Sequence, residues 1–194
     1  MDGTLVISLL DFNRIRAEAG VPEGMPVLEF LQVASPEHKL RAQAVLREHE
    51  LRAARQCQLR PGAVELLLEL RARGLKLALL TRNSRDSVEL VLKRFCLEFD
   101  CTVAREDARP KPHPEPILKI AEALALDPSE LLVVGDYIFD VQCGQRAGAL
   151  TALLRTGAQY MLTPPADIVV DDLLELLDHV PPLVRSGMEE GSYA

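Results

Sequence analysis

From about Arg60 onward, short apolar runs alternate with amphipathic stretches along the chain. The runs are continuously apolar and partly β-branched, which is typical of strands buried on both faces of a parallel sheet. They predict strands over residues 75–81, 101–104, 131–136, 151–154 and 168–170. The stretches between them predict helices over residues 63–73, 84–95, 114–126, 140–147 and 171–179. This strict alternation predicts a doubly wound α/β fold, in which helices cover both faces of a Rossmann-like parallel sheet.

The segment from residue 11 to residue 58 has a different pattern, with helical spacing throughout and prolines and glycines as breaks. It predicts helices over 12–19, 27–33 and 38–57, and the many Arg and Glu residues of the last one are expected to form a solvated face. We therefore expect a small helical cap at 11–58, inserted into an α/β core of residues 1–10 and 59–180. The polar segment 181–194 is predicted to be a loosely ordered tail.

Composition narrows the classes of partner. Lys and Arg total 22 against 29 Asp and Glu, a net charge of -7, so the surface offers no general attraction to nucleic acid or anionic lipid. No apolar stretch approaches the roughly 18 residues of a membrane span, and the four cysteines form no CxxC pair or disulfide-dense pattern. We expect a cytoplasmic protein with reduced thiols, unless a segment before Met1 carries an organelle address.

Polar side chains follow two of the predicted strands, at the edge where a parallel α/β sheet binds its ligands. Thr81, Arg82 and Asn83 stand where a strand stops and a helix begins, which presents a hydroxyl and free backbone N–H groups to an anion. Asp136 and Asp140 follow another strand, four residues apart. A single site for Mg²⁺, which prefers carboxylate oxygens, is the simplest interpretation of that pair.

Two further groups complete this set. Asp2 is followed by a turn glycine and a hydroxyl, and Lys111 lies between prolines that limit where its ammonium can reach. An acid, a hydroxyl at a helix start, a lysine and a carboxylate pair together indicate phosphoryl transfer, because metal and lysine offset the phosphate charge. Each residue also has a plainer interpretation. Thr81 and Asn83 are typical of a helix cap, Lys111 of a surface loop and Asp2 of a chain terminus.

The order and spacing of these residues resemble the haloacid dehalogenase (HAD) superfamily. Its four motifs are matched in sequence by Asp2-Gly3-Thr4-Leu5, by Thr81, by Lys111 in a Lys-Pro-x-Pro setting, and by Gly135 to Asp140 as Gly-Asp-x-x-x-Asp. The resemblance covers the chain from Met1 to about Asp172. The inserted helical segment resembles a short C1 cap of the phosphoglycolate-phosphatase-like members.

This resemblance implies a Mg²⁺-dependent hydrolase of small phosphate monoesters that works through an aspartyl-phosphate. Asp2 would be the general acid and base and would bind the metal through its backbone carbonyl. Asp136 and Asp140 would complete the metal site, with Asp140 supporting either the metal or the lysine. The phosphate would be bound by Thr81, Arg82, Asn83 and Lys111. The expected partner is a small phosphorylated metabolite, while its identity and the oligomeric state stay open.

The chain begins inside the first of these motifs. In the family the nucleophilic aspartate lies two positions before Asp2, and here Met1 occupies the position between them. We therefore expect the nucleophile and its central strand to be absent, which leaves a gap in the sheet. Five buried apolar side chains on such a strand contribute about 8 to 15 kcal/mol, comparable with the stability of a whole domain. The run 5–10 offers a substitute strand ending in Asp11, but the simpler expectation is that it leads into the cap.

The same residues also suit functions other than hydrolysis. A catalytically inactive pseudo-phosphatase or truncated isoform, which binds phosphate or a protein partner, is the main alternative. Dehalogenation needs neither a metal nor an acid two residues after the nucleophile, so Asp2 and the carboxylate pair favour a phosphatase, with a phosphomutase as a lesser candidate. A phosphoacceptor receiver domain has its acids early and its lysine last, whereas here Asp136 follows Lys111.

Overall fold

A computed structural model describes residues 1–156 and 165–180, so the predicted tail at 181–194 lies outside the described residues. The elements in chain order are β1 (Val6–Ile7), α1 (Phe12–Ala19), α2 (Val27–Val33), α3 (Pro36–Gln56), β2 (Gln58–Leu59), α4 (Ala63–Ala72), β3 (Ala78–Leu80), α5 (Arg85–Phe95), β4 (Cys101–Val103), α6 (Glu115–Leu124), η1 (Pro128–Glu130), β5 (Leu132–Gly135), α7 (Ile138–Ala147), β6 (Leu150–Leu154), β7 (Ile168–Val170) and η2 (Leu173–Asp178). None of the described helices is long and apolar enough to cross a membrane.

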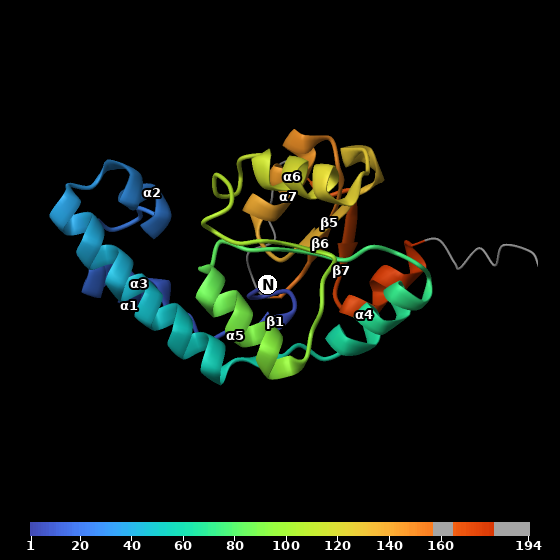
Figure 1. The fold of residues 1–194 in the computed structure, drawn as a ribbon, viewed down its shortest axis with the longest axis horizontal. Helices are drawn as coiled ribbons and strands as arrows, with labels where there is room; N and C mark the ends of the chain where they lie inside the picture. The colour runs from blue at the N-terminus through green and yellow to red at the C-terminus, as the bar shows by residue number, and fades with distance from the viewer. Residues whose placement is uncertain (157–164, 181–194) are drawn as a thin grey trace, which may run out of the picture.

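The strands of the core run parallel in two groups. β3 pairs with β4, and β6 pairs with β5 on one side and with β7 on the other. Helices α6 and α7 lie on one side of these strands and α4 and α5 on the other, as Figure 1 shows. The predicted α/β fold with a parallel sheet between helical layers is confirmed.

The two groups of parallel strands are neighbours without being paired. Ala78 of β3 and Val133 of β5 pack against the same apolar cluster, yet the described residues form no strand pairing between β3 and β5. The middle of β5, Leu132 to Val134, is half-buried, whereas residues 151–154 of β6 are buried throughout. The described residues therefore do not join the two groups into one hydrogen-bonded sheet.

The run at residues 5–10 does not pair with the strands of either group. β1 instead pairs antiparallel with β2, with Val6 opposite Leu59. Asp11 is the N-cap of α1, because its carboxylate accepts hydrogen bonds from the backbone N–H groups of Asn13 and Arg14, both at 3.0 Å. The run leads into the helical segment, as expected.

Helix α2 lies near the first end of the long helix α3 and α1 crosses α3 further along, both away from the strands (Figure 1). They share an apolar cluster of buried residues that all come from this segment: Ile15, Ala19, Val21, Val27, Leu31, Ala42 and Leu46. The other end of α3 packs on α5 and contributes Ala54 to a cluster of the α/β core. The three predicted cap helices are therefore observed, while the domain boundaries at residues 11 and 58 stay a prediction.

Three local predictions differ from the structure. The expected α-helix at 171–179 is the 3₁₀ helix η2, in which the buried Leu173 and Leu176 are three residues apart, as three residues per turn require. The antiparallel β1–β2 pair was not predicted, because two-residue strands are too short for a periodic pattern. Helix α5 has Ser84 as its N-cap rather than Asn83, which leaves the Asn83 side chain available for another contact.

Candidate functional site

The predicted site residues come together around one cavity of about 640 Å³, which lies between the α/β core and the cap helices. Loops after β3 and β5, the loop before α6 and the start of the chain all contribute to it. Its lining includes all seven residues proposed from the sequence: Asp2, Thr81, Arg82, Asn83, Lys111, Asp136 and Asp140. Side chains that are far apart in sequence thus face one space.

Lys111 and Asp140 form a buried ion pair in this cavity. The Lys111 Nζ donates to Asp140 Oδ1 at 2.5 Å, and the two residues are only 8% and 9% exposed. The other oxygen of Asp140 accepts a hydrogen bond from the Tyr137 backbone N–H at 3.2 Å. Both oxygens of Asp140 are therefore engaged by the protein, which agrees with the role of supporting the lysine.

Two glycines make room for the carboxylates of the site. A Cβ on Gly135 would lie 2.2 Å from Asp140 Cγ, and a Cβ on Gly3 would lie 2.0 Å from Asp136 Oδ2. Gly3 also has a φ of 75°, in the left-handed region that favours glycine. The glycines of the first and fourth motifs are thus explained by the acids that pack against them.

Asp136 lies next to the first motif. Its Oδ1 accepts a hydrogen bond from Thr4 Oγ1 at 2.9 Å. Burial raises the pKa of the Asp136 carboxyl, the hydrogen bond from Thr4 opposes this shift, and the negative charge of Asp140 adds to it. The ionised form of Asp136 is therefore opposed by burial and by Asp140, and favoured by Thr4 and by the N-terminal ammonium of Met1.

Asn83 connects the second motif to the first. Its Nδ2 donates to Asp2 Oδ2, and its backbone N–H donates to Thr81 Oγ1 at 3.2 Å. Thr81 and Asn83 are 5% and 8% exposed. The side chain of Asn83 therefore positions the acid of the first motif and does not cap α5.

Arg82 joins the core to the cap. Its Nη2 donates to both carboxylate oxygens of Glu29 in α2, at 2.7 and 2.8 Å. The guanidinium lies over the ring of Phe139, 5.1 Å from its centroid. Sequence reasoning placed Arg82 at a phosphate and contained no signal for Glu29, because their contact depends on how the cap is oriented over the core.

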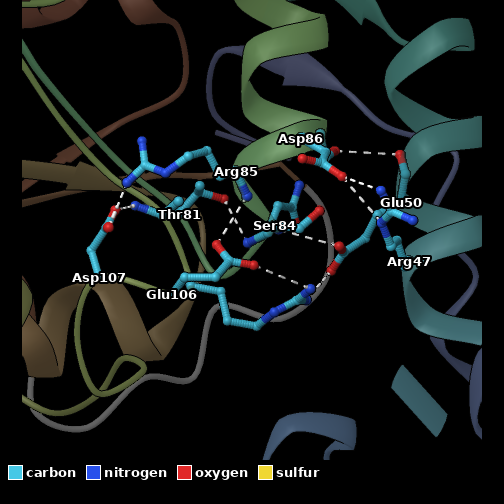
Figure 2. Close-up of polar contacts among 12 residues, drawn as sticks. Arg47, Glu50, Thr81, Ser84, Arg85, Asp86, Glu106 and Asp107 are labelled. Atoms are coloured by element: carbon cyan, nitrogen blue, oxygen red, sulfur yellow. Dashed lines mark hydrogen bonds and ion pairs between the residues drawn. The ribbon is translucent and has the colours of Figure 1, made fainter. Parts of the chain in front are cut away.

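A second link between cap and core is built around Glu50 of α3, shown in Figure 2. Its carboxylate is 3% exposed and accepts hydrogen bonds from the Ser84 backbone N–H at 3.2 Å and from Arg105 Nη1 at 2.5 Å. Burial raises the pKa of Glu50, and the charge of Arg105 opposes that shift. Arg47 of the same helix pairs with Asp86 of α5 (Figure 2). The predicted solvated face of this helix is wrong at Glu50, whose side chain anchors the start of α5.

Comparisons with known proteins agree with this arrangement. The family model of haloacid dehalogenase-like hydrolases matches residues 19–154. A haloacid dehalogenase-like hydrolase domain-containing protein of Arabidopsis thaliana is 32% identical over 174 residues, which are 82% of this chain and 70% of that protein. The pyrophosphatase PpaX of Bacillus anthracis is 36% identical over 128 residues, which are 63% of this chain and 59% of PpaX.

Solved structures agree with the sequence relatives. A hydrolase from Pseudomonas syringae matches with a TM-score of 0.77 and 27% sequence identity, and the match covers 92% of this chain and 94% of that one. The family model, the Arabidopsis relative and this structural match all cover most of the chain. The chain therefore belongs to the haloacid dehalogenase-like hydrolase family.

Proposed function

We propose that this site serves the Mg²⁺-dependent hydrolysis of small phosphate monoesters through an aspartyl-phosphate. The observation that carries the proposal is the meeting of Asp2, Lys111 and Asp136 around one cavity. The attacking carboxylate belongs two positions before Asp2, and residues 1–194 do not include that position. The proposed substrate is a small phosphorylated metabolite of the cytoplasm.

Lys111, Thr81 and Asn83 are proposed to bind the phosphate. The ammonium of Lys111 has three N–H groups and uses one of them on Asp140, so the others can donate to phosphate oxygens. Thr81 Oγ1 accepts from the Asn83 backbone, which leaves its hydroxyl hydrogen for an acceptor in the cavity. Arg82 is the fourth residue proposed for the phosphate. It would bind a phosphate oxygen while keeping its ion pair with Glu29.

Mg²⁺ fits the donors of this site. Burial raises the pKa of Asp136, and a divalent cation beside the carboxylate would stabilise its ionised form. Among residues 1–156 and 165–180, no three His, Cys, Asp or Glu side chains form a metal cluster. This suits Mg²⁺, which uses one or two carboxylates together with waters and substrate phosphate. Asp136 and the backbone carbonyl of Asp2 would bind the ion, and Asp140 would support the metal site. The ion would neutralise part of the negative charge of the phosphate.

Asp2 is proposed as the general acid and base. Its Oδ2 accepts the hydrogen bond from Asn83, which fixes the carboxylate and leaves the other oxygen for the leaving group. Asn83 therefore acts as a positioning residue for Asp2.

Phosphate binding without turnover is the second candidate function. It needs only the groups proposed for phosphate, which are assembled around the cavity. The same side chains would then bind a phosphorylated metabolite or a phosphorylated partner.

Calorimetry with inorganic phosphate and Mg²⁺ tests what the two candidates share. The 194-residue chain should bind phosphate, and Lys111→Ala should weaken that binding about tenfold or more, since charge-assisted hydrogen bonds are lost. The exposed Lys119→Ala is the matched control and should bind as the parent chain does. If the parent chain does not bind phosphate, both candidates are wrong.

Hydrolysis of p-nitrophenyl phosphate separates the two candidates. The intact mass and N-terminal sequence of the protein purified from its source establish whether an aspartate stands two positions before Asp2. With that aspartate we expect Mg²⁺-dependent hydrolysis that EDTA and Asp136→Asn abolish. Binding without hydrolysis in a protein that carries the aspartate would refute the proposed hydrolase.

A further inference from the structure

Arg16 brings a positive charge from the cap into the cavity. It lies on α1, is half-buried and lines the cavity together with the core residues of the site. The other two cationic side chains of the lining are paired with carboxylates, Lys111 with Asp140 and Arg82 with Glu29. Among the ion pairs of the described residues, none includes Arg16. Its guanidinium bonds to the neutral side-chain oxygen of Asn13.

The acids near Arg16 in sequence, and Glu50 of the cavity lining, are engaged elsewhere. Asp2 and Asp136 also line the cavity, but no ion pair of the described residues joins either of them to Arg16. Asp11 caps the start of α1 through two backbone N–H groups. Glu18 accepts from a histidine and from another arginine, each at 2.7 Å. Glu50, which lines the same cavity, pairs with an arginine of the core at 2.5 Å. Arg16 is therefore the Arg or Lys side chain of the lining that the ion pairs of the described residues leave for an anionic group of a ligand.

The cavity has the size and lining expected of a small-ligand site. Its volume of about 640 Å³ is within the range of roughly 300 to 1,000 Å³ typical of such pockets. Apolar side chains such as Phe12, Leu28 and Phe139 line the cavity together with Arg16 and the acids of the core. Because Arg16 and Lys111 line the same cavity, a ligand with its phosphate at Lys111 can present a second group to Arg16.

We propose that Arg16 determines substrate specificity by binding a second anionic group, a carboxylate or a phosphate, on the leaving group of the phosphate monoester. The inference rests on the proposed function, because it assumes that the first phosphate binds at Lys111. A guanidinium is suited to this task, since its planar N–H groups match the paired oxygens of either anion. Esters with neutral or cationic leaving groups would lose this contact.

Binding of matched ligands with Mg²⁺ tests the inference in the 194-residue chain. Phosphoglycolate differs from ethyl phosphate by a carboxylate, and pyrophosphate differs from methyl phosphate by a second phosphoryl group. Each doubly anionic ligand should bind about tenfold or more tightly than its partner. The pair that shows the larger difference identifies the anion that Arg16 prefers.

Arg16→Gln should remove this difference and leave the affinity for methyl phosphate and inorganic phosphate unchanged. Arg14→Gln is the matched control, because Arg14 lies on the same helix, is exposed and does not line the cavity. It should keep the parent preference, and circular dichroism melting checks that both variants fold. The inference is overturned if the parent chain binds both members of each pair equally well. It is also overturned if Arg16→Gln weakens the binding of all ligands equally. Failure of inorganic phosphate to bind the parent chain would instead refute the proposed function.

Discussion

Substitution of Gly135 by alanine tests the close packing between a motif glycine and its acid. A Cβ on Gly135 would lie 2.2 Å from both Cβ and Cγ of Asp140, which is closer than real Cβ atoms approach. The Asp140 side chain has to move, and its Oδ1 is the atom that holds Lys111 at 2.5 Å. The variant therefore perturbs the lysine without altering any charged residue.

The magnitude follows from the burial of the pair. Extra methyl groups in a packed interior cost about 1 to 3 kcal/mol. Removing one partner from a buried ion pair costs about 3 to 5 kcal/mol. The Lys111 and Asp140 side chains are only 9% and 12% exposed, but Gly135→Ala displaces Asp140 without deleting it. We expect a loss of about 2 to 4 kcal/mol in the free energy of unfolding, together with weaker phosphate binding.

Urea unfolding followed by circular dichroism measures the first effect, and calorimetry with inorganic phosphate measures the second. Gly148→Ala is the matched control, because nothing lies within 4 Å of its added Cβ and the cost comes from its φ of 83°. That backbone strain amounts to about 1 to 2 kcal/mol, and phosphate binding should be unchanged. The steric reasoning is refuted if the two alanine variants bind phosphate equally well.

Three further predictions concern residues away from the cavity. Hydrogen bonds from a histidine and an arginine lower the pKa of Glu18 from 4.5 to about 2. The ionised Glu18 carboxylate therefore stabilises the fold above pH 4.5, and this contribution is lost as pH falls towards 2. In urea titrations over this interval, the free energy of unfolding should fall less in Glu18→Gln than in the parent chain. Burial raises the pKa of the Cys143 thiol to about 11, so iodoacetamide at pH 8 should modify the exposed Cys96 first, as peptide mass mapping would reveal. Leu154 is 0% exposed, and Leu154→Ala should lower the free energy of unfolding in urea by about 2 to 5 kcal/mol. A smaller loss would mean that the neighbouring side chains move to fill the space left by the leucine.

The fold was predictable because its strands are short apolar runs bounded by polar turns. All five predicted core strands are present, and the helices between them agree to within a few residues. Prediction failed where the local pattern was too brief or ambiguous. The leucines of η2 fit either an α-helix or a 3₁₀ helix in sequence, and the structure keeps the three-residue spacing that buries Leu173 and Leu176 together.

The site was predictable where its residues follow strands directly, since parallel strands bring their carboxyl ends to one edge. Asp136 and Thr81 are of this kind, and both line the cavity. The contacts of the cap were not predictable. The helices that carry Glu29, Glu50 and Arg16 have an ordinary amphipathic pattern in sequence. The side chains or ligands that these three residues contact depend on how the helices are oriented over the core.

The charges around the cavity give a reason to expect that phosphate binding requires a cation. Lys111 is balanced by Asp140 and Arg82 by Glu29, whereas no ion pair of the described residues includes Asp2 or Asp136. A phosphate bound at Lys111 would therefore meet two carboxylates that form no ion pair and whose nearby positive charge is the buried N-terminal ammonium of Met1. Like charges at close range oppose binding. A divalent cation at these acids reverses that balance. Inorganic phosphate should thus bind the 194-residue chain at least tenfold more weakly in EDTA than in Mg²⁺, and Asp136→Asn should reduce this dependence. Equal affinity with and without Mg²⁺ would mean that the protein itself neutralises these acids.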